Sequence, residues 1–481
     1  MKRLSFCLML MFATCASLGA EGLLSLEDAV GMALERNPRL IEAELAWRQA
    51  QAERLLADSV EDSVLRLGVG YEDSGLPPAS FPGARGIQTG LAEASFLRRV
   101  GTGADVGVVG DSQRNFFDTG REGETPVYRS SVGVRLSQPL MQNRGGRTDR
   151  LRRAVADRGV ESAFLMLQRE RERVSAEVQD AWWVAVAERG YADTLVRAEQ
   201  RRQELVEDLR GKVEDGLVDV TELYAAEAAL ASYRLEVLRV SRLADRAEDE
   251  VRRLAFVDRR GWGQVTFRVE VPEAPGEAWG AVSDWDLFAH AETSRWDVRA
   301  IQRLIDQAEA TMLLAEDEGR MDVRVEGEYR RGDSGEGWSD SLGLDREVWA
   351  AGLRAEIPLG NRRTEARVIQ ARLEREFYMS EAESLLQVVF WECRNALGDF
   401  RAAQEAVGMA ERALMLQKRK RDGERVRFDR GQSSARFLIE DEDAVDFAER
   451  QLLAARLEAR RAWIQVKLAS GRLLAAREEG M

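Results

Sequence analysis

The residues that most often carry out catalysis are scarce in this sequence. Its one histidine, His290, is too few for a metal site built from several histidines or for a hydrolase triad that needs a second one. The chain contains neither a Walker phosphate loop nor a dinucleotide-binding fingerprint. Carboxylates are plentiful, but none stands in a strand-end or pocket pattern that favours acid–base chemistry. We therefore expect no enzymatic activity, no cofactor and no metal site.

Length and charge narrow the class of molecule. The 481 residues are 44% hydrophobic, which is enough to support a core and too much for a disordered chain. Acidic residues number 84 against 70 basic ones, so the formal net charge is -14. A nucleic-acid binder is expected to carry the opposite balance. We therefore expect no nucleic-acid partner.

The first residues are typical of an export signal. Residues 1–20 combine a basic start, an apolar run and small residues before a cleavage site expected near Ala20. A short membrane anchor and lipidation of Cys15 remain alternatives. If Cys7 and Cys15 leave with the signal peptide, Cys393 is the only cysteine left and no disulfide can form within the mature chain. No later segment has the length of a membrane-spanning helix without charges, whereas membrane strands give a weaker signal and stay possible.

Proline placement points to long helices. The stretches 140–271, up to the proline at 272, and 359–481 contain no proline and are rich in Ala, Leu, Glu and Arg, with apolar residues three and four apart. We expect helical hairpins over 148–256 and 362–475, with tips near residues 216 and 431. The first arm of each hairpin would be on the order of 95 Å long at about 1.5 Å per residue. Helices of that length must pack as coiled coils.

The two halves of the chain resemble each other. "QAQAERLLADS" at 49–59 aligns with "QAEATMLLAED" at 307–317, and the glycine break at Gly216 aligns with Gly431. Each copy reads as a helix, short strands, and a long helical hairpin. The predicted organisation is a signal peptide at 1–20, a first repeat at 21–256, a linker at 257–281 and a second repeat at 282–481.

Alternating residues predict strands at about 64–138 and 322–357. In the second copy, Val323, Val325 and Tyr329 fall on one face and charged residues on the other. Isolated hairpins cannot form a soluble core and need closure with other copies. The first copy holds 39 extra residues in this region, which are either a further hairpin of the barrel or part of its outer surface. Trp338 and Trp349 suit either a membrane interface or the cap of a soluble hairpin.

These features, in the order in which they follow one another along the chain, make it similar to the TolC-like outer membrane efflux proteins. The resemblance rests on "LSLEDAVGMALERNPRL" at 24–40, the strand exits "SQPLMQNRGG" and "EIPLGNRR", the two glycine turns, and "AWIQVKLASGRLL" at 462–474. It implies a mostly α fold with β-strands, in which a duplicated β-hairpin and long antiparallel helical hairpin form a trimeric α/β-barrel channel. It also implies an outer membrane location with a helical tunnel in the periplasm. The implied partners are outer membrane lipid, a periplasmic adaptor (membrane fusion protein) and an inner-membrane pump.

The resemblance also assigns residues. Gly216, Leu217, Val218, Gly431, Gln432 and Ser433 correspond to tips that dock the adaptor. Candidates for the periplasmic gate are Thr221, Glu222, Glu440, Asp441 and Asp443. In a trimer the acidic run that starts at Glu440 would form a ring of negative charge that favours cations. The second tip departs from the family pattern, with Phe428 and Ser433 where a tyrosine and an arginine are expected.

Two function classes follow. The first is a passive exit channel for efflux or type I secretion, and the second is a periplasmic coiled-coil structural or adaptor protein without a membrane barrel. Adaptors carry a single hairpin flanked by β-rich domains, whereas this chain repeats amphipathic strands between helices, which favours the channel. The transported substrate cannot be read from the sequence.

Overall fold

The computed structural model describes residues 23–75, 83–120, 125–258, 266–267 and 282–473. The predicted signal peptide, with Cys7 and Cys15, and most of the predicted linker lie outside these residues. The chain divides into two compact units. The first comprises Met1–Leu45, Phe164–Arg299 and Glu383–Met481, and the second comprises Ala46–Ala163 and Ala300–Ala382.

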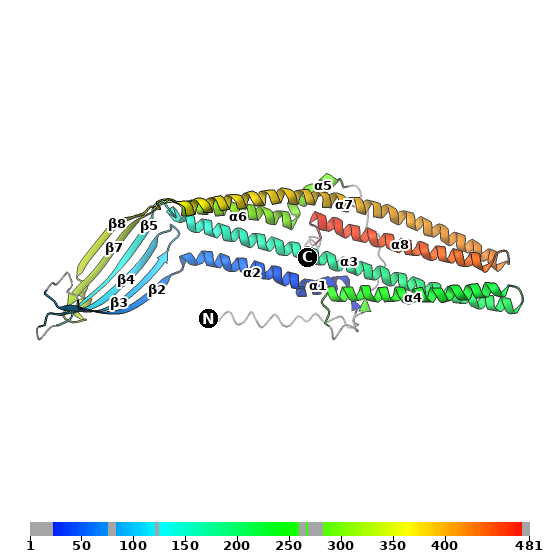
Figure 1. Ribbon diagram of the computed structural model, residues 1–481, viewed down its shortest axis with the longest axis horizontal. Helices are drawn as coiled ribbons and strands as arrows, with labels where there is room; N and C mark the ends of the chain where they lie inside the picture. Colours follow the sequence, from blue (N-terminus) through cyan, green and yellow to red (C-terminus); the bar gives the residue numbers. More distant parts are fainter. Residues whose placement is uncertain (1–22, 76–82, 121–124, 259–265, 268–281, 474–481) are drawn as a thin grey trace. The chain divides into compact units, whose positions relative to one another are not determined.

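One antiparallel sheet of six strands dominates the second unit (Figure 1). Its order is β2-β3-β4-β5-β7-β8, so every neighbour along the sheet is also the next of these strands in the chain. The strands are β2 (Val64–Ser74), β3 (Gly86–Arg99), β4 (Asp105–Asp118), β5 (Val127–Pro139), β7 (Asp322–Gly335) and β8 (Arg346–Glu356). The first repeat therefore supplies four strands and the second two. Among the described residues, β2 and β8 each have one edge without a partner strand.

The extra residues of the first repeat account for the unequal strand number. They form β3 and β4, a hairpin that lies between β2 and β5 in the same sheet. The sequence left open whether this insertion belonged to the sheet or to its outer surface. Because it adds two strands, β2 and β5 keep the opposite directions that they would have as direct neighbours.

A buried carboxylate fixes the passage from β5 into the following helix. The Asp317 side chain is 1% exposed and lies near the end of α6 (Trp296–Glu318). Thr148 Oγ1 donates to Asp317 Oδ2 at 2.6 Å, and the Asn143 backbone amide donates to the same oxygen at 3.2 Å. Asp317 thus binds both the second residue of α3 (Arg147–Glu214) and the residue before the short turn that leads into this helix.

Helices make up most of the rest of the described chain. The helices α3 and α4 (Val220–Leu254) form one antiparallel hairpin, and α7 (Arg362–Asp429) and α8 (Ala435–Ser470) form the other (Figure 1). The shorter helices are α1 (Leu26–Arg36), α2 (Pro38–Asp58) and α5 (Asp284–Ser294). A parallel pairing of β1 (Leu23–Leu24) with β6 (Thr266–Phe267) links the chain's start to the region between the repeats.

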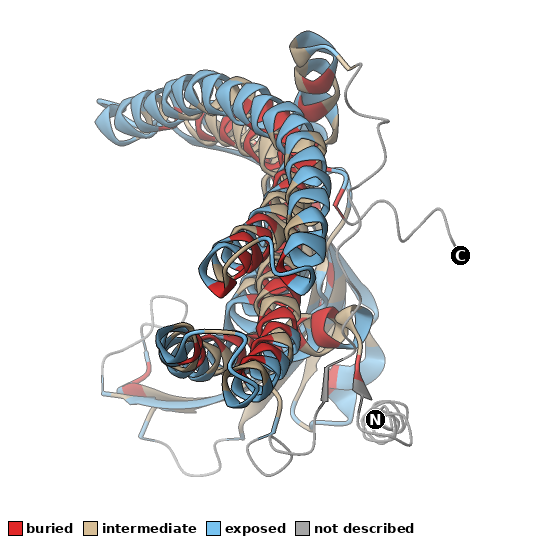
Figure 2. Ribbon diagram, turned by 90° about the vertical axis from the view of Figure 1, so that its right-hand side faces the viewer, coloured by how far each residue is buried: buried red, intermediate tan, exposed pale blue. Residues whose placement is uncertain are grey.

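Apolar stripes hold these helices together. One cluster joins α5, α7 and α8 around Leu287, Val389, Leu397, Phe400 and Val466. Buried positions recur along the helices at helical spacing, and exposed ones occupy the other faces (Figure 2). The sequence predicted this pattern of packed helical hairpins, and the mostly α fold with antiparallel strands is confirmed.

Candidate functional site

The first hairpin turn is built on a left-handed glycine. Gly216 has φ +72°, and its amide donates to Val213 O at 3.0 Å while the Leu217 amide donates to Lys212 O at 2.8 Å. This pairing closes the C-terminal turn of α3, where a residue with a side chain would be strained. Leu217 is left 73% exposed at the turn. The turn therefore presents an apolar side chain to solvent.

The next helix begins with a side-chain cap. Asp219 Oδ1 accepts from the Thr221 amide at 2.7 Å and from Thr221 Oγ1 at 2.6 Å, and these bonds lower the pKa of the Asp219 carboxyl. The hydroxyl of Thr221, a predicted gate residue, is thus used at the start of its own helix α4. Val218 is partly buried against the core between the two turns.

The second turn repeats the first. Gly431 has φ +70°, its amide donates to Phe428 O at 2.9 Å, and the Gln432 amide donates to Arg427 O at 2.9 Å. Ser433 Oγ is hydrogen bonded to the Glu424 carboxylate. Two turns 215 residues apart therefore share one backbone geometry, as the internal repeat predicts.

The two turns are joined directly. Glu222 Oε2, in the first turn of α4, accepts from the Ala435 amide at the start of α8 at 3.0 Å. Leu209, Leu223, Phe428 and Leu438 form a buried core beneath this bond. This bond and this core thus hold the hairpin turns of the two repeats together.

An ionic cluster lies further along the helices from the turns. Asp446 on α8 accepts from Arg202 Nη1 at 2.7 Å, from Arg201 Nη2 at 3.1 Å and from the Tyr233 hydroxyl at 2.9 Å. Arg202 also stacks on the Tyr233 ring, 3.7 Å from its centroid. Burial raises the pKa of Asp446, and the charge of Arg202 opposes that rise. The cluster joins α3, α4 and α8 through groups that are largely removed from water.

The predicted gate carboxylates on α8 all have cationic partners in their own chain. Glu440 is paired with Arg436 one turn earlier, at 2.9 Å. Asp441 accepts from Lys420 Nζ at 2.6 Å, and Asp443 accepts from Arg202 Nη2 at 2.5 Å. Their charge is therefore partly compensated within one copy, and their gate role stays a prediction.

The six-stranded sheet exposes an apolar face. Successive strand partners place one apolar residue from each strand in a single row, with side chains between 41% and 77% exposed. The row consists of Leu65, Phe96, Val108, Val134, Tyr329 and Trp349. A soluble sheet would bury such a row, because apolar area of this extent is costly in water.

The opposite face carries charged residues that pair across strands. Arg330 Nη1 donates to Asp111 Oδ1 at 2.8 Å, and Arg135 Nη2 donates to Glu328 Oε1 at 3.4 Å. Alternation along each strand separates these side chains from the apolar row. The sheet thus has one face suited to lipid and another suited to water.

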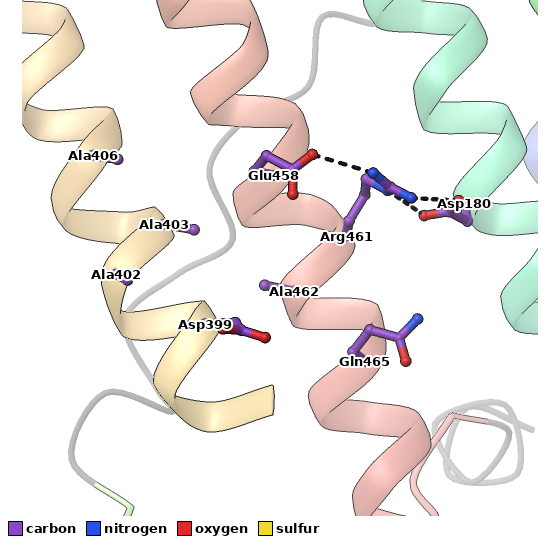
Figure 3. A pocket seen from close by; sticks show the side chains of 9 residues that line it. All are labelled: Asp180, Asp399, Ala402, Ala403, Ala406, Glu458, Arg461, Ala462 and Gln465. Atoms are coloured by element: carbon purple, nitrogen blue, oxygen red, sulfur yellow. Dashed lines mark hydrogen bonds and ion pairs between the residues drawn. The ribbon is translucent and has the colours of Figure 1, made fainter. Parts of the chain in front are cut away.

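A groove lies between α7 and α8 and is bordered by α3 (Figure 3). Arg461 Nε on α8 donates to Asp180 Oδ1 on α3 at 2.6 Å, and Arg461 Nη1 donates to Glu458 at 3.2 Å. The α7 wall presents Ala402, Ala403 and Ala406. Neither histidine nor cysteine occurs among the nine lining residues, so the groove lacks a nucleophile–base pair.

The part of the chain that the structure describes holds no group of three or more His, Cys, Asp or Glu residues placed to bind a metal ion. No helix in those residues is both long enough and apolar enough to cross a bilayer.

The arrangement of strands and paired helical hairpins is a TolC-like fold, similar to that of solved outer membrane channels. The outer membrane protein VceC from Vibrio cholerae matches with a TM-score of 0.64 and 15% identity, over 93% of this chain and 96% of that one. The CmeC outer membrane channel of Campylobacter jejuni matches with a TM-score of 0.63 and 15% identity, over 94% and 88%. The open state of the Neisseria gonorrhoeae MtrE channel matches with 0.60 and 17%, over 93% and 89%. No protein-family model and no curated protein sequence matches the chain.

Sequence reasoning missed the ionic cluster. Arg202, Tyr233 and Asp446 lie on three helices, and Arg202 and Asp446 are 244 residues apart. Their neighbourhoods are as rich in charge as the rest of the helices, so no local signal marks them. The acidic run on α8 was the one available sign.

Proposed function

We propose that this chain is the outer membrane channel of a tripartite efflux or type I secretion system. It passively conducts substrates from a periplasmic adaptor and inner-membrane pump to the exterior. The observation that carries this proposal is the sheet with an exposed apolar row on one face and ion pairs on the other. Membrane barrels have this arrangement, with an apolar outer band and a polar interior.

Three copies would complete the barrel. The unpaired edges of β2 and β8 carry backbone amides and carbonyls that need partners in a bilayer. Pairing β8 of one copy with β2 of the next satisfies both edges and closes a ring. The similarity in fold to outer membrane channels supports a homotrimer with its helices in the periplasm.

The two hairpin turns are the proposed docking surface for the adaptor. Gly216, Leu217 and Val218 form one turn and Gly431, Gln432 and Ser433 the other. Leu217 supports this role because it is exposed and apolar at a turn, where its side chain gains nothing from the chain's own core. The bond from Ala435 to Glu222 would present both turns to a partner as one surface.

The gate is proposed to lie next to these turns. Glu440, Asp441 and Asp443 follow the second turn, and Thr221 and Glu222 follow the first. Opening would require that some of their present bonds break, because each of these residues is bonded within the chain.

Neighbouring alanines on β8 provide a matched test. Ala351 lies on the face of the apolar row, Ala350 lies on the ion-paired face opposite Glu328, and both are exposed. An arginine on a lipid-facing strand position costs about 2 to 4 kcal/mol near the bilayer midplane. We expect Ala351→Arg to lower the yield of assembled protein in the outer membrane fraction and Ala350→Arg to leave it nearly unchanged. Equal yields for the two variants would contradict a lipid-facing sheet.

The rival function makes the opposite predictions. A periplasmic coiled-coil structural or adaptor protein would be released without detergent and would tolerate both arginines. We expect the wild-type protein to need detergent for extraction and to form a conductance in planar bilayers. Recovery in the soluble periplasmic fraction would favour the rival.

A further inference from the structure

The inserted hairpin β3–β4 lies between the two strands that the internal repeat would otherwise make neighbours. We propose that it is part of the membrane wall, so that three copies close a barrel of eighteen strands in place of the twelve that the repeats alone would supply. This inference rests on the proposed trimeric channel and concerns the composition of its wall. The partner at each sheet edge is a second copy of this chain.

Ion pairs tie the insertion to the second repeat. Asp105 and Asp111 on β4 pair with Arg324 and Arg330 on β7, at 3.3 Å and 2.8 Å, across the intervening strand β5. Ser112 Oγ and Ser130 Oγ lie 2.9 Å apart between β4 and β5. A hairpin folded away from the sheet would lose these bonds and leave two arginines of the polar face without these carboxylates.

The apolar row also runs through the insertion without a break. Phe96 and Val108 stand between Leu65 and Val134, with each pair of neighbours directly opposite along the sheet. Phe96 and Val108 are 48% and 49% exposed, like the rest of the row. If the hairpin left the wall, these side chains would lose the lipid contact that the row's other members keep.

Strand number sets the size of the exit. At about 4.8 Å between strands and a tilt of about 40°, twelve strands give a backbone diameter of about 24 Å and eighteen give about 36 Å. The insertion would therefore widen the outer part of the duct by about half. The number of strands stays even, so antiparallel pairing continues around the ring.

The repeat predicts which residues would meet in each arrangement. Val325 lies opposite Leu353 in the second copy, and these positions correspond to Leu67 and Val134 in the first. With the hairpin outside the wall, Leu67 and Val134 would be neighbours. With the hairpin in the wall, Val134 lies opposite Val108, and Leu67 is three strand steps away and opposite Val132, which puts it more than about 14 Å from Val134.

The same correspondence predicts the contact between copies. Val134 lies opposite Tyr329 where β5 meets β7. The equivalent positions on β8 and β2 are Leu353 and Tyr71. We therefore expect Leu353 of one copy to face Tyr71 of the next, which gives a separate test of the trimer.

Cross-linking of cysteine pairs in isolated outer membranes can show whether the hairpin lies inside or outside the wall. In a Cys393→Ser background, a short thiol cross-linker is expected to join V108C to V134C within one chain and to leave L67C and V134C unlinked. Mass spectrometry of the linked peptides provides the readout. A link between L67C and V134C without one between V108C and V134C would overturn the eighteen-stranded wall.

Two controls separate the possible failures. Deletion of residues 86–118 should bring L67C and V134C together, which verifies that the reagent detects direct pairing. The pair Y71C and L353C should give covalent trimers on a denaturing gel. Loss of those trimers would contradict the proposed channel assembly, whereas the two pairs within one chain report only on the hairpin.

Electron cryomicroscopy of the full-length protein should show eighteen strands in the barrel, and a barrel of twelve strands would overturn the inference.

Discussion

Glu222 on α4 accepts a hydrogen bond from the Ala435 amide at the first turn of α8, with 3.0 Å between Oε2 and N. Ser434, the N-cap residue of α8, makes no capping bond through its own side chain. A carboxylate from the other repeat therefore supplies the cap that the local sequence lacks. Negative charge at a helix N-terminus is favourable because it meets the positive end of the helix dipole.

Removal of this carboxylate should loosen the start of α8. We expect Glu222→Ala to cost about 1 kcal/mol locally, which corresponds to about fivefold faster amide exchange over residues 435–438. Glu222→Gln keeps an acceptor oxygen but loses the charge, so its effect should be smaller. Hydrogen exchange with mass spectrometry measures both.

The matched control is Glu227→Ala on the same helix. Glu227 pairs with Arg210 of its own hairpin at 2.8 Å, and both side chains are exposed, so the pair contributes little. We expect exchange in the first turn of α8 to stay at the wild-type rate in this variant. Equal acceleration by both substitutions would show that the cap is unimportant.

The stability of the protein should depend much more on the buried ionic cluster than on an exposed gate residue. Asp446→Asn leaves Arg202, whose side chain is 5% exposed, with a weaker counter-charge. Breaking a buried pair from one side costs about 3 to 5 kcal/mol. We expect Asp446→Asn to lower the free energy of unfolding by about that amount, measured by urea titration with helical circular dichroism.

Asp443 provides the comparison within the same cluster. It also bonds Arg202, at 2.5 Å, but its side chain is 61% exposed and is therefore screened by water. Asp443→Asn should cost about 1 kcal/mol or less. A loss for Asp443→Asn as large as that for Asp446→Asn would contradict the assignment of the stabilisation to burial.

The backbone turns of the candidate site could be predicted, whereas the contacts between its helices could not. Gly216 and Gly431 interrupt long proline-free stretches, and a left-handed glycine is the usual way to end such a helix. The bond from Ala435 to Glu222 depends on how two hairpins pack, 213 residues apart. No pattern within either hairpin specifies that register.

In the sheet, too, the local structure could be predicted and the contacts between elements could not. Alternation along 322–357 predicted strands with one apolar face, because a side chain's face follows from its position in the strand. The insertion also alternates, but alternation does not say which strands are its neighbours. The pairing of Asp105 and Asp111 with arginines on β7 depends on the strand order, which the sequence does not specify.

Acid should weaken the helical unit through Asp297. Burial opposes the charged form of this carboxyl, but hydrogen bonds from Arg295, at 2.6 Å and 3.0 Å, and the charge of Arg169 outweigh it, so its pKa lies below the ordinary 3.8. A lowered pKa adds stability that is present above about pH 3.8 and is lost as pH falls through the folded-state pKa.

We expect the melting temperature of the wild-type protein to fall more steeply than that of Asp297→Asn between about pH 4 and pH 2. At neutral pH the variant should melt at a lower temperature, since Arg295 loses the charge of Asp297 and keeps Glu392, at 2.5 Å, as its carboxylate partner among the described residues. Thermal scans by circular dichroism across this pH range test both points. Parallel pH profiles for the two proteins would exclude Asp297 as a source of the acid sensitivity.

Cys393 should be inert to thiol reagents while the protein is folded. Its side chain is fully buried between α7 and α8, its Sγ lies 3.6 Å from Ala469 O, and burial raises its pKa to about 11. At pH 8 about one thiol in a thousand would then be ionised, and the thiolate is the reactive form.

Maleimide labelling at pH 8, read from the mass of the Cys393 peptide, should be negligible in the native protein and complete after denaturation. The positive control is A402C in a Cys393→Ser background, which places a thiol at an exposed position of the groove in Figure 3. That thiol should react in the native state within minutes. Native labelling of Cys393 at a similar rate would mean that α7 and α8 separate readily there, which is incompatible with a closed apolar core around Val389 and Val466.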